Sequence, residues 1–226
     1  MNIANNILKH SLKNVYFLVG TACSGKTTMA NALSKKYGFI HFSRNKYEDE
    51  ESYKVWQSII DEKYQPNSTK RKDMDWEKYY SRSVEEFLAD ENDKNASDEY
   101  LDFAIIELIK LSQNNKVIAD IRILDFNLIT DISDYNRIAC LLAPGELIVR
   151  DNYVRDDHRD RIERIQSLKD SEKKFETQYE LMRIRAKEMA EQAKKYNLFS
   201  IMRSEESTVE DTLRLLEKHF CLINGL

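Results

Sequence analysis

Residues 20–27 read Gly20-Thr21-Ala22-Cys23-Ser24-Gly25-Lys26-Thr27. They fit the pattern Gly-x-x-x-x-Gly-Lys-Ser/Thr, in which two glycines let the backbone turn sharply and approach a phosphate without a Cβ in the way. Successive backbone N–H groups of such a loop converge on phosphate oxygens. We therefore predict that this loop and Thr28 bind the phosphates of ATP. In this prediction Lys26 reaches the β- and γ-phosphates, and the Thr27 hydroxyl binds Mg²⁺.

The flanking residues support this interpretation. Residues 15–19 are an apolar run that predicts a buried strand, and residues 28–37 predict a helix that ends near Gly38. A strand, a glycine loop and a helix in this order aim the N-terminus of the helix at a bound phosphate. A chance match on a tight turn is the alternative. Only 5 glycines occur in the whole chain, and two of them occupy the two required positions.

Composition limits the class of protein. The chain has 226 residues, enough for one α/β domain with an inserted subdomain. Charged residues make up 33% of it and the net charge is −4, which argues against a strongly basic nucleic-acid binder. The 3 cysteines form no CxxC pair, as expected for reduced thiols, and we assign Cys23 no catalytic role. Neither a secretory signal nor a membrane span is evident, so we expect a cytoplasmic protein without a nucleic-acid or membrane partner.

Strand and helix patterns alternate through the rest of the chain. Apolar runs predict strands at residues 39–43, 116–122, 137–143 and 198–202, with helices between them, and Ser207 to Glu210 has the form of a capping box. Such alternation predicts a three-layer α/β/α fold with a central parallel five-stranded sheet. We interpret residues 1–226 as one domain. Within it we predict a helical, aromatic-rich insert at residues 46–95, with a capping box at Ser83, and an arginine-rich lid at residues 150–170.

Asp120 and Arg122 are the best candidates for chemistry on the third predicted strand. Asp120 ends an apolar run, and a carboxylate there is costly unless a cation is nearby, so we predict that it helps to hold Mg²⁺. The alternative is a helix-capping or ion-paired aspartate. Arg122 would lie on the same side and could grip a phosphate or carboxylate of the acceptor. Its alternative is an ion pair with Asp120 or Asp125.

Other arginines extend the predicted site. Arg44 follows the second predicted strand, at the edge where α/β proteins bind ligands, and could grip the acceptor. In the predicted lid, Arg150 would contact the nucleotide, Arg155 would stabilise the charge of the transferred group, and Arg159 would bind the acceptor. A solvated helix face with i,i+4 ion pairs is the alternative for these three residues.

Together these features resemble the P-loop kinase group that contains nucleoside monophosphate kinases and shikimate kinase. The resemblance spans most of the chain and adds Pro144-Gly145-Glu146 to the motifs above. It implies an acceptor-binding insert at residues 46–95, a lid at residues 150–170, and a nucleotide base near residues 202–209. The second strand ends in Ser43-Arg44-Asn45, where shikimate kinases carry an aspartate, so the resemblance leaves the acceptor open.

The leading hypothesis is an ATP- and Mg²⁺-dependent kinase of a small phosphate- or carboxylate-bearing acceptor, with a nucleoside monophosphate as the first choice. In it Lys26, Asp120, Arg122 and Arg155 are the catalytic residues. One alternative is a kinase of a hydroxyl on a metabolite or at the 5′ end of a polynucleotide. Another is a nucleotide-binding regulator without turnover.

Overall fold

The computed structural model describes residues 5–43, 53–55, 58, 74–121, 126–152 and 158–223, with the backbone alone for residues 91–99. About half of the predicted insert, including residues 46–52 and 59–73, lies outside the described residues. The elements in chain order are α1 (Asn5–Ser11), β1 (Val15–Gly20), α2 (Lys26–Tyr37), β2 (Ile40–Ser43), α4 (Trp76–Tyr80), α5 (Val84–Leu88), α6 (Glu91–Ser112), β3 (Val117–Asp120), α7 (Phe126–Ile132), a 3-10 turn (Tyr135–Arg137), β4 (Ile138–Leu142), α8 (Gly145–Asn152), α9 (Arg159–Gln166), α10 (Ser171–Lys195), β5 (Phe199–Met202) and α11 (Val209–His219).

The strands of the described residues form one five-stranded sheet in the order β2-β3-β1-β4-β5. All four neighbouring pairs run parallel, and β1 lies at the centre between β3 and β4. The predicted α/β class and the five-stranded parallel sheet are therefore confirmed.

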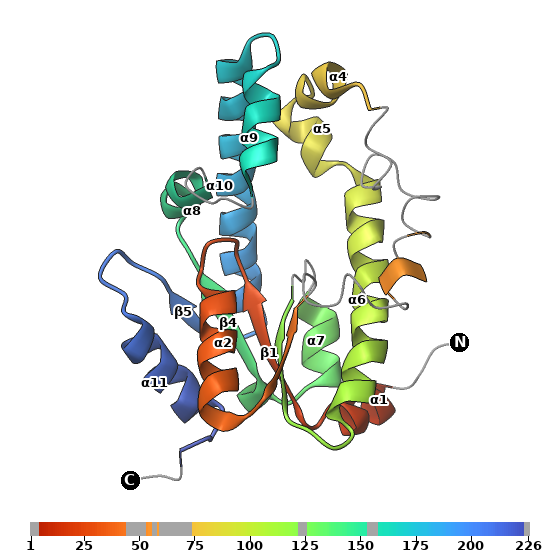
Figure 1. The fold of residues 1–226 in the computed structure, drawn as a ribbon, viewed down its shortest axis with the longest axis vertical. Coiled ribbons are helices and arrows are strands. Elements are labelled where there is room, and N and C mark those ends of the chain that lie inside the picture. Colours follow the sequence, from red (N-terminus) through yellow and green to blue (C-terminus); the bar gives the residue numbers. More distant parts are fainter. Residues whose placement is uncertain are drawn as a thin grey trace.

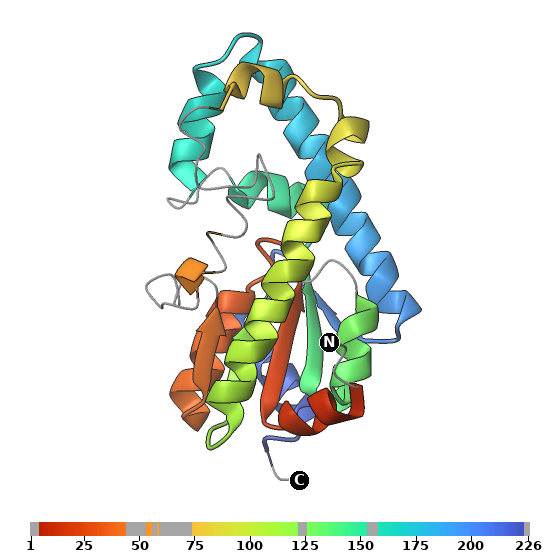
Figure 2. The same cartoon turned by 90° about the vertical axis from the view of Figure 1, so that its right-hand side faces the viewer.

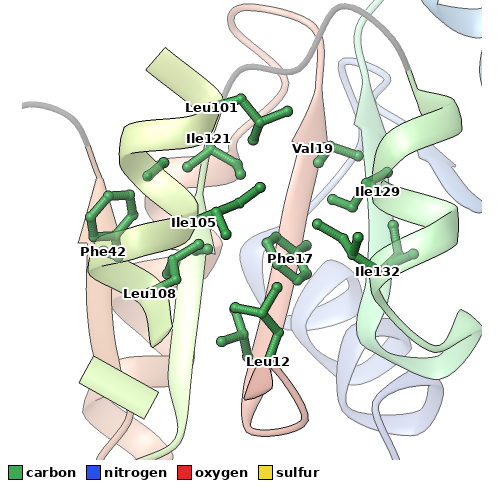
Figure 3. Close-up of a cluster of buried hydrophobic side chains, with 14 of the residues drawn as sticks. Leu12, Phe17, Val19, Phe42, Leu101, Ile105, Leu108, Ile121, Ile129 and Ile132 are labelled. Carbon is green, nitrogen blue, oxygen red and sulfur yellow. The ribbon is translucent and has the colours of Figure 1, made fainter. Parts of the chain in front are cut away.

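Helices cover both faces of the sheet. Side chains of a strand point alternately to opposite faces, and in β1 both sets are apolar and pack against helices. On one face Tyr16 and Leu18 of β1 pack with residues of α2 and α11. On the other face Val15, Phe17 and Val19 pack with α6, α7 and the end of α10 (Figures 1 and 3). Both faces of β1 are thus buried, which explains why its sequence is apolar without interruption.

The connections that leave β1 and β4 run in opposite directions. The chain after β1 passes through α2 to β2 on one side of the sheet, and the chain after β4 leads to β5 on the other. In parallel α/β sheets the crevice at the carboxyl ends of two such strands is the usual ligand site. Two hydrogen bonds join the strands there: the Thr21 N–H donates to Leu141 O (3.0 Å), and the Ala143 N–H donates to Thr21 Oγ1 (2.7 Å).

Two long helices, α6 and α10, extend beyond the carboxyl edge of the sheet (Figures 1 and 2). The short helices α4, α5 and α9 lie around their far ends, and α10 contacts α5, α8 and α9 along its length. We call α4, α5, α9 and the N-terminal half of α10 the helical arm. The arm stands on the side of the sheet where the connection between β1 and α2 lies.

Helix ends test the predicted caps. The capping box at Ser83 is confirmed, since its side chain accepts from the Glu86 N–H while the Glu86 carboxylate accepts from the Ser83 N–H. The predicted box of Ser207 and Glu210 is wrong by one residue. Thr208 is the N-cap of α11 and accepts from the Asp211 N–H. Ser207 instead accepts a hydrogen bond from the Ser204 N–H (2.9 Å), which turns the chain before the helix.

Candidate functional site

The loop of residues 20–27, which we call the glycine loop, requires glycine at two positions. Gly20 ends β1 with a φ of 124°, and Gly25 precedes α2 with a φ of 90°. Both φ angles lie in a region that residues with a Cβ rarely adopt. At Gly20 a Cβ would also lie 1.9 Å from the carbonyl oxygen of Leu141. The backbone path, and with it the close approach of the loop to β4, therefore depends on these glycines.

The first turn of α2 has no side-chain cap. The helix begins at Lys26, not at Thr28 as the sequence pattern predicted, and its N-cap Gly25 offers no side-chain hydrogen bond. The first N–H groups of a helix have no partner within the helix, and the helix dipole places partial positive charge at this end. This end faces the carboxyl edge of the sheet and is suited to an anion.

Lys26 folds back over the glycine loop. Its Nζ donates hydrogen bonds to the carbonyl oxygens of Gly20 (3.2 Å) and Thr21 (2.5 Å). The ammonium group is thus positioned above the loop by backbone oxygens, next to the N-terminus of α2. An anion held at this helix end would meet a fixed cation, which strengthens the hydrogen bonds between them.

Thr27 and Asp120 lie together beside Lys26. The Thr27 hydroxyl donates to Asp120 Oδ2 at 2.5 Å. Among the residues that the structure describes, no group of three or more His, Cys, Asp or Glu side chains could hold a metal ion. Mg²⁺ usually takes one or two protein oxygens and completes its shell with water and substrate phosphates. The two oxygens of Thr27 and Asp120 fit that kind of site.

A first cleft of about 520 Å³ opens on one side of the glycine loop. From the loop and α2 it is lined by Cys23, Ser24, Gly25, Thr28 and Met29. Its opposite wall contains Arg203 and residues 207–209 at the start of α11. The volume is typical of pockets for small molecules, which span about 300–1,000 Å³.

A second cleft of about 770 Å³ lies on the other side of the loop, beneath the helical arm. Gly20, Thr21, Ala22 and Lys26 line it from the loop. The cationic side chains of Arg161, Arg185 and Lys195 line it from α9 and α10, with apolar residues such as Leu181 and Met182 between them. The glycine loop therefore lines both clefts. The second cleft has more cationic side chains than acidic ones, which are Asp90 and Glu188, and it also has apolar surface.

The predicted lid and insert come together in the helical arm. Lys174 of α10 is buried and donates to Glu77 of α4 (2.6 Å) and to the carbonyl oxygen of Lys169 (2.7 Å). The guanidinium of Arg164 lies 4.2 Å from the ring centre of Trp76, within cation–π distance. We call the contacts of Glu77, Trp76, Arg164 and Lys174 the arm clasp. The hydrogen bond from Lys174 holds the pKa of Glu77 below its ordinary value, which keeps this carboxylate charged.

The remaining predicted arginines have mixed outcomes. Arg44, Arg122 and Arg155 lie outside the described residues. Arg150 is exposed and donates hydrogen bonds to Asp151 (3.0 Å) and Glu205 (2.5 Å). These hydrogen bonds raise the pKa of Arg150, and its guanidinium is paired with two carboxylates. Arg159 is exposed at the start of α9, and the described lining of neither cleft includes it.

The structure adds residues that the sequence did not single out. Arg203 donates from Nη1 to the carbonyl oxygen of Cys23 and to Asp151 Oδ2, the latter at 2.7 Å. Arg185 lines the second cleft from the middle of a long charged helix. Arg203 follows β5 within residues 202–209, where the resemblance placed the nucleotide base, but nothing in the sequence marks this residue individually. Arg185 is one of many charged side chains of α10 that look alike in the sequence. The thiol of Cys140 in β4 plays no part, since burial raises its pKa to about 12.

Comparisons with known proteins assign no family. A scan against protein-family models finds no match, and a search of curated proteins finds no relative. Within the described residues, no helix has both the length and the apolar character needed to cross a membrane. What the site can bind and do is therefore inferred from its geometry.

Proposed function

We propose that the protein is a P-loop kinase, similar in plan to nucleoside monophosphate kinases and shikimate kinase. It would transfer the γ-phosphoryl group of ATP to a small phosphate- or carboxylate-bearing acceptor. The observation that carries this proposal is the position of the glycine loop between two clefts. Cys23, Ser24 and Gly25 face one cleft, and Gly20, Thr21 and Lys26 face the other. Phosphoryl transfer requires a donor and an acceptor held next to each other, and substrates bound in these two clefts would meet over the loop.

In this proposal the first cleft holds the nucleoside part of ATP. Thr208 and Val209 flank it at the start of α11, and Met29 provides an apolar wall. The phosphates would cross the glycine loop toward Lys26, so that the γ-phosphate enters the second cleft. The uncapped N-terminus of α2 and the Lys26 ammonium group would then hold its negative charge.

Thr27 and Asp120 would hold Mg²⁺ against the phosphates. Their oxygens lie 2.5 Å apart, close enough to share one ion after a small separation. When bound, Mg²⁺ supplies charge neutralisation on the phosphate oxygens. The chain itself positions the groups: Lys26 orients the transferred phosphoryl group, and Asp120 supplies the negative charge that keeps a cation at this point.

The second cleft would bind the acceptor. Arg161 and Arg185 provide cations for a phosphate or a carboxylate, and Leu181 and Met182 provide surface for an apolar or ring-shaped body. The acceptor oxygen would form a bond to the γ-phosphorus while the bridging P–O bond of ATP breaks and ADP leaves. A nucleoside monophosphate has both an anionic group and a flat ring and is the acceptor that we would test first.

An acceptor screen tests the proposal. The protein is incubated with ATP and Mg²⁺ and with one nucleoside monophosphate or small acid at a time, and ADP release is measured. Acceptor-dependent ADP supports a kinase. ADP that appears without an acceptor would indicate an ATPase, and tight ATP binding without ADP would indicate a regulator; either result contradicts the proposal.

The variant Lys26→Ala tests the role of the glycine loop in the same assay. Its side chain bonds to carbonyl oxygens at the surface of the loop, so its loss leaves the apolar core intact. We expect phosphoryl transfer to be abolished and the thermal unfolding midpoint to stay close to that of the unaltered protein. Near-normal turnover of this variant would contradict the proposed role of the loop.

A further inference from the structure

Arg203 has a fixed position at the edge of the first cleft. It directly follows β5, and its backbone N–H donates to the carbonyl oxygen of Leu142 at the end of β4 (2.8 Å). The sheet therefore determines where the side chain starts. From there the guanidinium reaches the glycine loop, and Arg203 lines the cleft together with Cys23 and Asp151.

A single nitrogen of Arg203 joins two other parts of the chain. Nη1 donates to the carbonyl oxygen of Cys23 at the apex of the glycine loop and to Asp151 Oδ2 in α8 (2.7 Å). Burial alone would raise the pKa of Asp151, but the hydrogen bonds from Arg150 and Arg203 outweigh it and lower that pKa. Asp151 thus remains a carboxylate and orients the guanidinium toward the loop.

Cys23 needs such support. Its φ of 55° lies in the left-handed region, which is unfavourable for a residue with a Cβ. Residues in such conformations persist where their surroundings hold them. A hydrogen bond between a cation and the Cys23 carbonyl is the strong kind of support. On the other side of the apex, the Ser24 hydroxyl donates to the carbonyl oxygen of Thr21 (2.9 Å).

We propose that Arg203 is a positioning residue that, together with Asp151, holds the apex of the glycine loop in the conformation that receives the nucleotide phosphates. The inference rests on the proposed function for its nucleotide, but the structural part concerns the loop alone. Arg203 acts through the Cys23 carbonyl, which fixes the direction of the N–H groups that follow it. It also ties the loop to Asp151 at the end of α8, where the predicted lid begins.

Two measurements test this role. The first is the affinity for ATP and Mg²⁺ by titration calorimetry, for which we expect Arg203→Met to weaken binding roughly 10- to 100-fold, the range for a lost charge-assisted hydrogen bond. Arg203→Lys keeps a charged donor and should recover part of the loss. Arg214→Met, on the exposed surface of α11, is the matched control and should bind ATP as the unaltered protein does.

The second measurement reports on the loop without any nucleotide. In a Cys221→Ser background, an aromatic disulfide reagent reacts with the half-exposed Cys23, because Cys140 is buried. We expect Arg203→Met to increase the rate of this reaction several-fold, since the apex is then less restrained. Arg214→Met should leave the rate unchanged.

The outcomes separate the two proposals. If the unaltered protein binds ATP, and Arg203→Met changes neither affinity nor thiol rate, the inference is wrong while the proposed function stands. If the unaltered protein binds no ATP, the proposed function fails, and the thiol rate still decides whether Arg203 restrains the loop. Should Arg203→Met not fold, Arg203→Lys and Asp151→Asn replace it, and we expect smaller losses in the same direction; no change in either variant would overturn the inference.

Discussion

Thr27 Oγ1 and Asp120 Oδ2 lie 2.5 Å apart although 93 positions separate the two residues in the chain. The sheet brings them together. Asp120 ends β3 opposite Leu18 of β1, and Thr27 is in the first turn of the helix that follows β1. A hydroxyl and a carboxylate thus meet beside the glycine loop, at the carboxyl edge where parallel sheets bind their ligands.

Asp120→Asn tests this pair as part of a magnesium site. We expect ATP to bind the variant without Mg²⁺ about as well as it binds the unaltered protein, whereas the gain in affinity that Mg²⁺ provides should be lost. Turnover should fall roughly 100- to 1,000-fold, the usual effect of removing one group that stabilises charge in the transition state. The measurement is ATP affinity with and without Mg²⁺, together with ADP release.

The control for this prediction is Asp134→Asn. Asp134 is exposed, pairs with Lys9 (2.8 Å) and lines neither cleft. Its substitution therefore removes the same charge without altering the site. If both variants lose turnover equally, the effect belongs to net charge, and the magnesium role of Asp120 is wrong.

The two glycines of the loop should respond differently to alanine. Gly20→Ala places a Cβ against the Leu141 carbonyl at a φ of 124°, so we expect a loss of at least about 2 kcal/mol in the free energy of unfolding. At Gly25 an added Cβ would meet no atom within 4 Å. Only the left-handed φ disfavours alanine there, so we expect Gly25→Ala to lower the free energy of unfolding by about 1 kcal/mol. Denaturant unfolding of both variants measures the difference. Equal losses would contradict the close approach of β1 to β4.

Much of this site could be predicted from the sequence because its signals are local. Gly20, Gly25, Lys26 and Thr27 belong to one contiguous motif, and Asp120 is recognisable as a charge at the end of an apolar run. The parallel sheet followed from the alternation of strands and helices. Each of these features can be recognised from a few consecutive residues, and the rules of parallel α/β topology then place them at one edge of the sheet.

Other contacts of the site and the arm cannot be recognised from a few consecutive residues. Arg203 contacts Cys23 across 180 positions, and the contact exists only because β5 lies beside β4. Likewise, Glu77 and Lys174 meet because two remote helices extend past the sheet. The Ser207 box was a local prediction that failed, since Ser207 bonds back to Ser204 and leaves the cap to Thr208. Tertiary contacts decided the first two cases, whereas competing local hydrogen bonds, each spanning three residues, decided the cap.

The arm clasp should weaken in acid. The hydrogen bond from Lys174 lowers the pKa of Glu77, so the clasp contributes stability above the ordinary glutamate pKa of about 4.5 and loses it as the pH falls through the lowered value. Trp76 reports on the clasp because the Arg164 guanidinium lies over its ring. In a Trp56→Phe background, Trp76 fluorescence should change as the pH falls below 4.5.

Glu77→Gln provides the comparison. It removes the titrating carboxylate and leaves the buried Lys174 without its anionic partner, so Trp76 should show at neutral pH the fluorescence that acid produces in the unaltered clasp. Amide exchange in α4 should also become faster. If Glu77→Gln retains both the neutral-pH fluorescence and the acid transition, the clasp does not hold the arm.

Arg185 offers the sharpest separation of acceptor from donor. It lines the second cleft from α10, whereas the first cleft, where we place the nucleoside part of ATP, is lined by other residues. We expect Arg185→Met to raise the KM for the acceptor roughly tenfold or more, as for the loss of a charge-assisted hydrogen bond, while the KM for ATP changes by less than about twofold. Lys187→Met, an exposed position on the same helix, removes an equal charge and should change neither constant. Steady-state kinetics with each substrate varied in turn gives both values. A rise in the KM for ATP alone would place the acceptor elsewhere and assign Arg185 to the donor.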